Sequence, residues 1–120
     1  MRKYFLVLVM ASCLFITACK KATPDIVENI PDCIRTEIIT IINNPQLLIS
    51  GVTEYRFQNK LVYAFAPDST VIADGSTAIK DKNCTTLCNV GGYGGPQINL
   101  CNGDNFFQTA VLTRIIWRKY

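Results

Sequence analysis

The clearest pattern of apolar and polar positions lies between Gly51 and Pro67, where two apolar runs flank Gln58-Asn59. Valine, tyrosine, phenylalanine and leucine dominate both runs, and such runs on either side of a short polar turn predict a β-hairpin. Asn59 suits the turn because asparagine tolerates the positive φ that a tight hairpin requires. The turn also sets the predicted register: Tyr55 faces Val62, and Glu54 faces Tyr63.

The segment from Pro31 to Asn44 has apolar residues at positions 34, 38, 41 and 42, which is the spacing of a helix. Asp32 is the expected N-cap, since its carboxylate can accept a hydrogen bond from a backbone N–H one turn onward. Pro45 ends the segment. A strand remains the alternative, because the isoleucines of this segment are β-branched and also suit a sheet.

The chain from Asp68 to Asn105 reads mainly as loop, because turn signals follow one another along it. Short strands are expected only near Val71-Ile72 and near Ile98-Leu100. A last strand is predicted from Ala110 to Arg118. Four of its residues would lie on one side of that strand: Val111, Thr113, Ile115 and Trp117.

The first residues of the chain are typical of an export signal. Arg2 and Lys3 precede an almost unbroken apolar run from Tyr4 to Ile16. This run of about 13 residues is shorter than the roughly 20 that a membrane-spanning helix requires, and it fits the apolar part of a secretory signal. The run ends at Ile16-Thr17-Ala18-Cys19, which resembles the lipobox of bacterial lipoproteins. In that motif the cysteine is acylated and becomes the first residue after cleavage.

Two alternatives remain for this leader. A plain secretory signal prefers small residues at −1 and −3, whereas Ile16 stands at −3, and a retained signal anchor would be short. The lipoprotein interpretation discards Cys13 with the signal and attaches the protein to the membrane through the lipid on Cys19, because two or more acyl chains anchor stably. It divides the chain into three parts: a signal peptide over 1–18, a lipidated tether over 19–30 and a single domain over 31–120.

Charge and composition narrow the partners. The chain has 12 basic and 9 acidic residues, and loss of Arg2 and Lys3 with the signal lowers its net charge from +3 to about +1. This charge is too small and too evenly spread to indicate nucleic acid. Lys20-Lys21 would lie at the lipid headgroups, where each charge gains from anionic lipid. We therefore expect a protein of the bacterial cell envelope with no nucleic-acid partner.

Four cysteines remain in the predicted domain, and an exported chain meets an oxidising environment, so they indicate two disulfides. All three connectivities are open. We favour one bridge from Cys33 to Cys84 or Cys88, and a second from Cys101 to the other of these two. With the helix and strands above, this predicts an α+β fold in which one N-terminal helix packs on a small antiparallel sheet, followed by a long disulfide-stapled loop region.

Metal sites are weaker interpretations of the loop region. Zinc is disfavoured by the Cys-x3-Cys spacing of Cys84 and Cys88 and because the chain contains no histidine. Asp74, Asp81 and Asp104 are calcium candidates, but they lack the EF-hand spacing, and aspartate is also a common turn residue. The GGYGG segment matches no phosphate-binding loop. We expect neither a metal nor another cofactor.

The sequence lacks the usual catalytic patterns. It has no histidine, which is the commonest general base, and its serines lack a G-x-S-x-G setting, so we expect no enzymatic activity. The expected role is a binding or structural module whose protein or glycan partner is not identified. Tyr93, between two glycine pairs, is a candidate ligand contact, whereas Phe106, Phe107 and Trp117 are assigned to the core. A calcium- or glycan-dependent binding module is the alternative, and a small envelope enzyme is less favoured.

Asp68-Ser69-Thr70 resembles the short acceptor for protein O-glycosylation in the envelope of Bacteroidota. Aspartate followed by serine is also a common start of a turn. Ser69 is therefore a candidate glycosylation site.

A further set of motifs runs through the predicted domain: Pro31-x-Cys33-Ile34, Tyr55-x-Phe57-Gln58-Asn59-Lys60-x-Val62-Tyr63, Ala66-Pro67, Gly91-Gly92, Cys101-x-Gly103-Asp104-x-Phe106 and Ile116-Trp117. Together they resemble a family of small, uncharacterised Bacteroidota lipoproteins that carry a domain of unknown function. The resemblance covers about residues 31–117 and implies architecture and location, but no activity. Two positions depart from the family: Gln58-Asn59 stands where Asn-Gly is common, and Asp68-Ser69 where a Cys-Cys pair is common.

Overall fold

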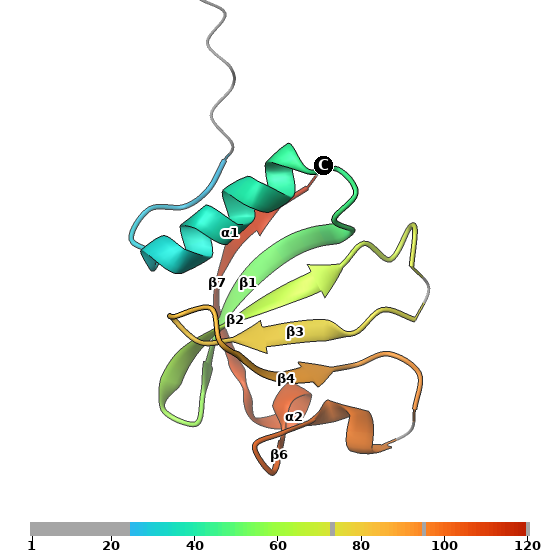
Figure 1. Cartoon of the computed structure of the whole chain (residues 1–120). Helices are drawn as coiled ribbons and strands as arrows, with labels where there is room; N and C mark the ends of the chain where they lie inside the picture. The colour runs from blue at the N-terminus through green and yellow to red at the C-terminus, as the bar shows by residue number, and fades with distance from the viewer. Residues whose placement is uncertain (1–24, 73, 95, 120) are drawn as a thin grey trace, which may run out of the picture.

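The structure is a computed structural model that describes residues 25–72, 74–94 and 96–119. The predicted signal peptide and Cys19 lie outside these residues. The described chain is an α+β fold in which a helix lies on a five-stranded antiparallel sheet (Figure 1). The helix is α1 (Asp32–Asn43), and the strand order is β4-β3-β2-β1-β7. The strands are β1 (Ile49–Phe57), β2 (Lys60–Pro67), β3 (Thr77–Lys80), β4 (Thr86–Val90) and β7 (Val111–Arg118).

The predicted hairpin is confirmed. β1 and β2 pair across the two-residue turn Gln58-Asn59, with Tyr55 opposite Val62 and Glu54 opposite Tyr63. Both turn residues adopt positive φ, 50° for Gln58 and 61° for Asn59. This is the geometry of the turn whose twist matches the right-handed twist of the flanking strands.

The segment after Pro31 is a helix and not a strand. Ile34, Ile38 and Ile41 form one buried stripe, which a strand of the same residues would have split between two faces. The prediction of Asp32 as the N-cap is wrong. Pro31 occupies that position, its carbonyl accepts a hydrogen bond from the Arg35 N–H at 3.0 Å, and no side chain caps the helix. Asp32 lies one residue later, in the first turn, where its negative charge interacts favourably with the helix dipole.

The expected long loop between residues 68 and 105 is wrong in part, because two of the sheet strands come from it. β3 pairs with β2, and β4 pairs with β3, and each contributes one fully buried residue, Ile79 and Val90. Val71-Ile72 is a turn, not a strand. The second expected strand is replaced by a 3-10 helix, η1 (Pro96–Asn99), followed by β5 (Leu100–Cys101).

The last strand is confirmed, but its predicted alternation is wrong. Two irregularities interrupt the pairing of β7 with β1, one between Val52 and Thr53 and one between Glu54 and Tyr55. A bulge shifts the side chains that follow it to the other face. Consequently the adjacent residues Ile116 and Trp117 are both buried, whereas Ile115 is 40% exposed.

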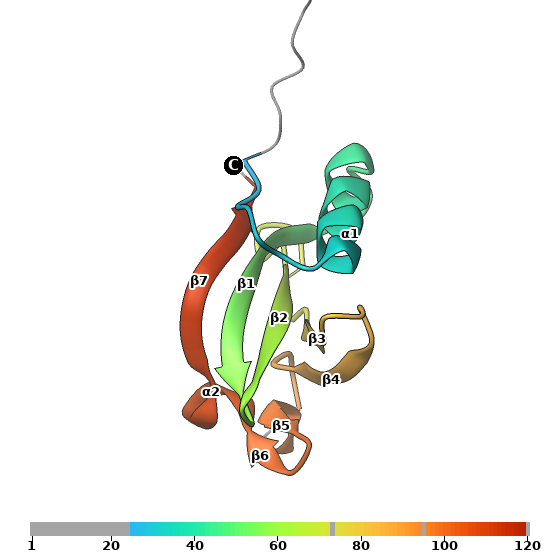
Figure 2. The same ribbon diagram turned by 90° about the vertical axis from the view of Figure 1, so that its left-hand side faces the viewer.

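The core has two parts, one on each face of the sheet. α1 covers one face and packs against Val52, Phe65 and Trp117 (Figure 2). The other face is covered near the hairpin turn by Cys101 and Phe106, which lie against Phe57. The covering elements are β5, β6 (Asp104–Asn105) and α2 (Phe106–Thr109). Phe107, assigned to the core from sequence, is 56% exposed because α2 turns it outward.

Residues 25–29, the edge segment, run beside the outer edge of β7. The Val27 N–H donates to the Ile116 carbonyl at 3.2 Å, and Arg114 donates to the carbonyls of Glu28 at 3.0 Å and Asn29 at 2.8 Å. The segment therefore runs antiparallel to β7, and the described chain begins at the end of the sheet where β7 ends (Figures 1 and 2). Ile30 is 8% exposed and belongs to the core, so the last part of the predicted tether packs on the domain.

Candidate functional site

A groove lies between the β1–β2 hairpin, the β3–β4 turn and the start of α1. The lengths of the elements explain it: a 12-residue helix is about 18 Å long, whereas nine strand residues span about 30 Å, so the helix cannot cover the whole hairpin. The groove has a volume of about 850 Å³. Its lining combines apolar side chains with amides and two lysines: Asn29, Ile30, Pro31, Phe57, Gln58, Lys60, Leu61, Val62, Tyr63, Asp81, Lys82, Asn83, Leu87 and Asn102.

One edge of β2 is open inside this groove. β3 pairs with β2 only from Tyr63 to Phe65, so the first residues of β2 have no strand on that side. The two-residue turn makes Phe57 and Lys60 a hydrogen-bonded pair, and the next pair, which contains Leu61, is then a non-hydrogen-bonded one. The N–H and C=O of Leu61 therefore point away from β1 into the groove. Among the described residues no loop backbone bonds to them, and the Leu61 side chain is 40% exposed.

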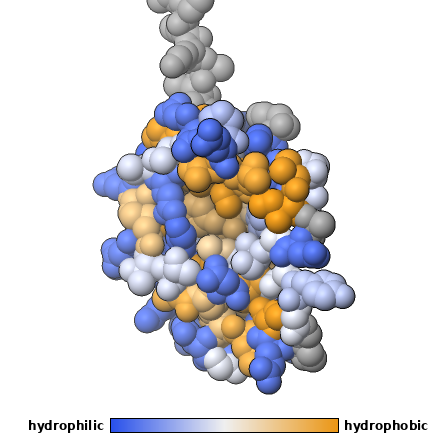
Figure 3. Space-filling model, turned by 45° about the vertical axis from the view of Figure 1, so that its right-hand side comes forward, coloured by the Kyte–Doolittle hydropathy of each residue, from blue (hydrophilic) through white to orange (hydrophobic). Residues whose placement is uncertain are grey.

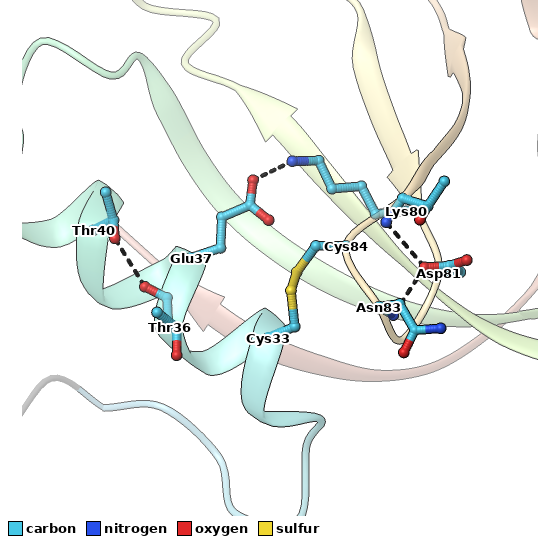
Figure 4. The surroundings of a disulfide bond; sticks show 9 residues. Cys33, Thr36, Glu37, Thr40, Lys80, Asp81, Asn83 and Cys84 are labelled. Atoms are coloured by element: carbon cyan, nitrogen blue, oxygen red, sulfur yellow. Dashed lines mark hydrogen bonds and ion pairs between the residues drawn. A yellow bond between two sulfur atoms is a disulfide. The ribbon is translucent and has the colours of Figure 1, made fainter.

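The β3–β4 turn, which forms the second wall, is fixed to α1. A disulfide joins Cys84 of the turn to Cys33 in the first turn of the helix (Figure 4). About one helical turn further on, Glu37 accepts a hydrogen bond from Lys80 at the end of β3. The Lys80 ammonium also lies 4.8 Å from the centre of the Phe65 ring. The wall is thus held by a covalent bond and an ion pair.

Hydrogen bonds within the β3–β4 turn fix its shape. One Asp81 carboxylate oxygen accepts from the backbone N–H of Asn83 at 2.8 Å and of Thr85 at 3.0 Å. The Asp81 N–H donates to the Thr85 carbonyl at 3.0 Å. Cys84 has a φ of 63° in this turn, and the Asx-type bonds help to hold that left-handed conformation. The Asp81 carboxylate thus serves the turn itself.

Hydrogen bonds to the β5–β6 turn fix the hairpin turn. The Gln58 amide donates to the Asn102 carbonyl at 3.2 Å and to the Asp104 carboxylate at 2.8 Å. A second disulfide joins Cys88 of β4 to Cys101 of β5, which ties this turn to the sheet. The four cysteines therefore form the two disulfides that the sequence indicates, and their pairing is of the favoured kind.

A buried carboxylate supports the third wall of the groove, which is the chain at the start of α1. Glu54 is 4% exposed, and its oxygens accept from the Thr113 hydroxyl at 2.7 Å and from Arg114 Nε and Nη2, both at 3.2 Å. Burial raises the pKa of Glu54, but the hydrogen bonds and charge of Arg114 outweigh it, so the pKa lies below its ordinary value. The same guanidinium holds the carbonyls of Glu28 and Asn29, beside the groove.

Tyr63, at the inner end of the groove, also has a shifted pKa. Burial raises its pKa to about 12, and the charge of Glu54 and a hydrogen bond to it act in the same direction. An unfolded tyrosine titrates at 10.0, so the folded state holds its proton more tightly. The stability from this shift is complete below pH 10 and is lost as the pH rises towards 12.

We therefore expect the free energy of unfolding to fall with pH above 10, and Tyr63→Phe to remove about 1 kcal/mol of that fall by pH 11. Urea unfolding at pH 9, 10 and 11 measures the slope. The matched control is Tyr93→Phe, at a side chain that is 92% exposed, and it should leave the slope unchanged. Equal slopes in the wild type and Tyr63→Phe would contradict the assignment.

Of the remaining predicted site residues, only Asp81 lines the groove. Tyr93 projects from the turn after β4, and Ser69 is exposed in the turn after β2. The Asp68 carboxylate beside Ser69 accepts from the Thr70 N–H at 3.0 Å and hydroxyl at 2.6 Å, as in an ordinary turn. The calcium candidates belong to three separate segments: Asp74 to the loop before β3, Asp81 to the β3–β4 turn and Asp104 to β6. The described ranges contain no cluster of three or more acidic or cysteine side chains that could hold a metal.

Within residues 25–72, 74–94 and 96–119, none of the helices has the length and apolar character needed to cross a membrane.

Apart from Asp81, the groove residues are not among the site residues that the sequence predicts. Leu61, Lys82, Leu87 and Asn102 become neighbours only through the pairing of β3 with β2 and of β5 with β6. One signal was available. Leu61, Tyr63 and Phe65 alternate along β2, and the predicted helix is too short to cover all three.

Comparison with protein families identifies the class of this chain. Residues 42–119, about two thirds of the sequence, match the family described as Domain of unknown function (DUF6970). The chain belongs to this family. The match includes the whole five-stranded sheet and begins near the end of α1, so Cys33 precedes it. No curated protein matches the chain, and no solved structure matches it.

Proposed function

We propose that the chain is a lipid-anchored protein of the bacterial cell envelope that binds an extended peptide segment in the groove and has no catalytic activity. The observation that carries the proposal is the open edge of β2 at Leu61. An extended peptide that adds to a free strand edge gains main-chain hydrogen bonds for affinity, and pockets beside that edge select its side chains.

The lining of the groove fits such a ligand. Ile30, Leu61 and Leu87 offer apolar contacts next to the open edge, as specific peptide sites require. Lys60 and Lys82 are both exposed, whereas the carboxylate of Asp81 is engaged within its own turn. The balance of charge therefore favours a neutral or acidic peptide over a basic one.

Preorganisation supports binding in this groove. Each wall is fixed by contacts that exist without a ligand: the Cys33–Cys84 disulfide, the bonds of Gln58 to the β5–β6 turn, and the contacts of Arg114 with residues 28 and 29. A site that is already ordered loses less conformational entropy on binding.

The non-catalytic part of the proposal has two supports. The chain contains no histidine. Its most buried carboxylate, Glu54, has both oxygens engaged by Thr113 and Arg114 and is therefore poorly suited to proton transfer. The anchor is supported by the apolar leader, by Ile16-Thr17-Ala18-Cys19 and by Lys20-Lys21 beside the expected lipid.

A pair of substitutions at Leu61 tests the groove. Leu61→Pro removes the N–H that faces the groove, and a proline at a strand edge leaves the hydrogen bonds of its neighbours to β1 intact. Leu61→Ala keeps the N–H and removes the side chain. We expect a phage-displayed hexapeptide library to yield binders of the wild type whose affinity falls at least about tenfold in Leu61→Pro and less in Leu61→Ala.

Thermal melts of both variants show whether the fold is retained. Leu100→Ala, at a side chain that is 47% exposed outside the groove, is the matched control and should bind like the wild type. Equal loss in Leu61→Pro and Leu61→Ala would show that the backbone does not pair with the peptide. Absence of peptide binders would contradict the proposed peptide ligand. Changes in the NMR signals of the groove amides on addition of soluble oligosaccharides, and not of peptides, would indicate a glycan ligand instead.

A further inference from the structure

Three segments that are distant in the sequence meet at one end of the domain: the loop at Leu47 and Leu48, the turn over 68–72 and the end of β7 at Arg118 and Lys119. We call it the tether end. The Asp68 N–H donates to the Leu48 carbonyl at 2.8 Å, and the Lys119 N–H donates to the Ser50 carbonyl at 2.8 Å. The Val71 N–H donates to the Asp68 carbonyl at 3.1 Å. The loop before β1, the turn after β2 and the end of β7 therefore share this end.

The chain enters the domain at the same end. Because residues 25–29 run antiparallel to β7, the described chain begins at the end of the sheet where that strand ends (Figure 2). Six residue steps separate Asp25 from Cys19, and at 3.3–3.6 Å each they span at most about 20 Å. An acylated Cys19 would thus hold the tether end close to the bilayer, whatever path those residues take.

The surface at the tether end combines exposed apolar side chains with basic ones. Val71 is 61% exposed and Leu47 is 40% exposed, on neighbouring turns. In the space-filling view the largest group of strongly apolar residues lies at the upper right, and smaller groups lie in the lower half (Figure 3). Exposed aliphatic side chains at a membrane surface gain by entering the headgroup region.

The charges at this end complement an anionic surface. Arg118 and Lys119 are exposed, and Lys119 lies 3.7 Å from an Asp68 carboxylate oxygen. Three acidic residues lie at the same end: Asp25, Asp68 and Asp74. The Lys20-Lys21 pair of the tether brings the basic residues to four, and each such charge is attracted to anionic lipid.

From these observations, and resting on the lipid anchor proposed above, we infer that the tether end is a membrane-docking surface. Leu47 and Val71 enter the headgroup layer of an anionic bilayer, and Arg118 and Lys119 face its phosphates. The hairpin turn and the groove then point away from the membrane. The anchored domain has a fixed orientation and does not tumble freely on its tether.

The test places a fluorescent reporter at each end of the domain. The mature acylated protein is reconstituted in vesicles of phosphatidylglycerol and phosphatidylethanolamine that carry bromine on their acyl chains. Val71→Trp is compared with Val111→Trp, which has a matched exposure of 63% at the far end of the sheet. The native Trp117 is buried and gives the same background in both variants.

We expect bromolipid to quench the reporter at position 71 at least about threefold more than the one at position 111, since docked side chains lie about 5–10 Å deep. Arg118→Glu together with Lys119→Glu should reduce the quenching at position 71. Equal quenching at the two positions overturns the docking surface. A glycan on Ser69, seen in the intact mass, would also overturn it, because it would hold Val71 off the bilayer.

The anchor is measured separately, so that the two failures differ. Acyl labelling and flotation with vesicles report the lipid, and both should be lost in Cys19→Ala. Protein that is labelled and floats but shows no preference for position 71 contradicts only the docking surface. Protein that is neither labelled nor floats contradicts the anchor and the docking surface together.

Discussion

Replacing Cys33 and Cys84 together by alanine is expected to lower the free energy of unfolding by about 4 kcal/mol. The bridge closes a loop of 51 residues, and the stabilisation from a cross-link grows with the logarithm of the loop that it closes. The Cys88–Cys101 bridge closes only 13 residues, so the matched double alanine variant should lose about 3 kcal/mol. Urea unfolding under oxidising conditions measures both losses.

The two disulfide variants should also differ in the groove. Loss of the first bridge frees the β3–β4 turn from α1. Amide hydrogen exchange at positions 82, 83 and 84 should therefore accelerate while the sheet stays protected. Loss of the second bridge should leave those amides protected. A larger loss of stability from the shorter loop would contradict the chain-entropy explanation. Unchanged exchange in the β3–β4 turn would show that its internal hydrogen bonds suffice to hold it.

Glu54→Gln is expected to cost about 2–3 kcal/mol, because it removes the charge that Arg114 faces inside the protein. The amide can accept only through its oxygen, so in either orientation its nitrogen would oppose one of the two Arg114 donors. Glu37→Gln is the control, since the Glu37–Lys80 pair is partly exposed and should be worth at most about 1 kcal/mol.

The pH dependence gives an independent check of this pair. The folded pKa of Glu54 is lowered, so its contribution is complete above the ordinary value of 4.5 and is lost as the pH falls through the folded value. Between pH 5 and pH 3 the wild type should lose more stability than Glu54→Gln. Parallel curves for the two proteins in urea unfolding would show that the carboxylate is not preferentially ionised in the folded state.

Local sequence signals predict the elements whose partners are close along the chain. The hairpin register could be derived because a two-residue turn leaves one way to pair Tyr55 with Val62. The helix followed from isoleucines that form one stripe only at helical spacing. In both cases the residues that decide the structure lie within one short window of sequence.

The parts that could not be predicted depend on distant partners. β3 and β4 are short, and threonine, lysine and asparagine stand among their few apolar residues, so each is identified only by the strand beside it. The bulges in β7 that bury Ile116 next to Trp117 leave no mark in the sequence. The groove also depends on a distant partner, because it lies where β3 stops short of the first residues of β2.

The edge segment also protects the outer edge of the sheet. Residues 25–29 cover part of the outer side of β7 and meet the Ile116 carbonyl and Arg114. Removal of residues 25–29 would uncover a strand edge that lies beside the exposed side chains of Leu112 and Ile115. An uncovered edge of this kind can pair with another chain, so the five residues before Ile30 keep β7 from acting as a template for association.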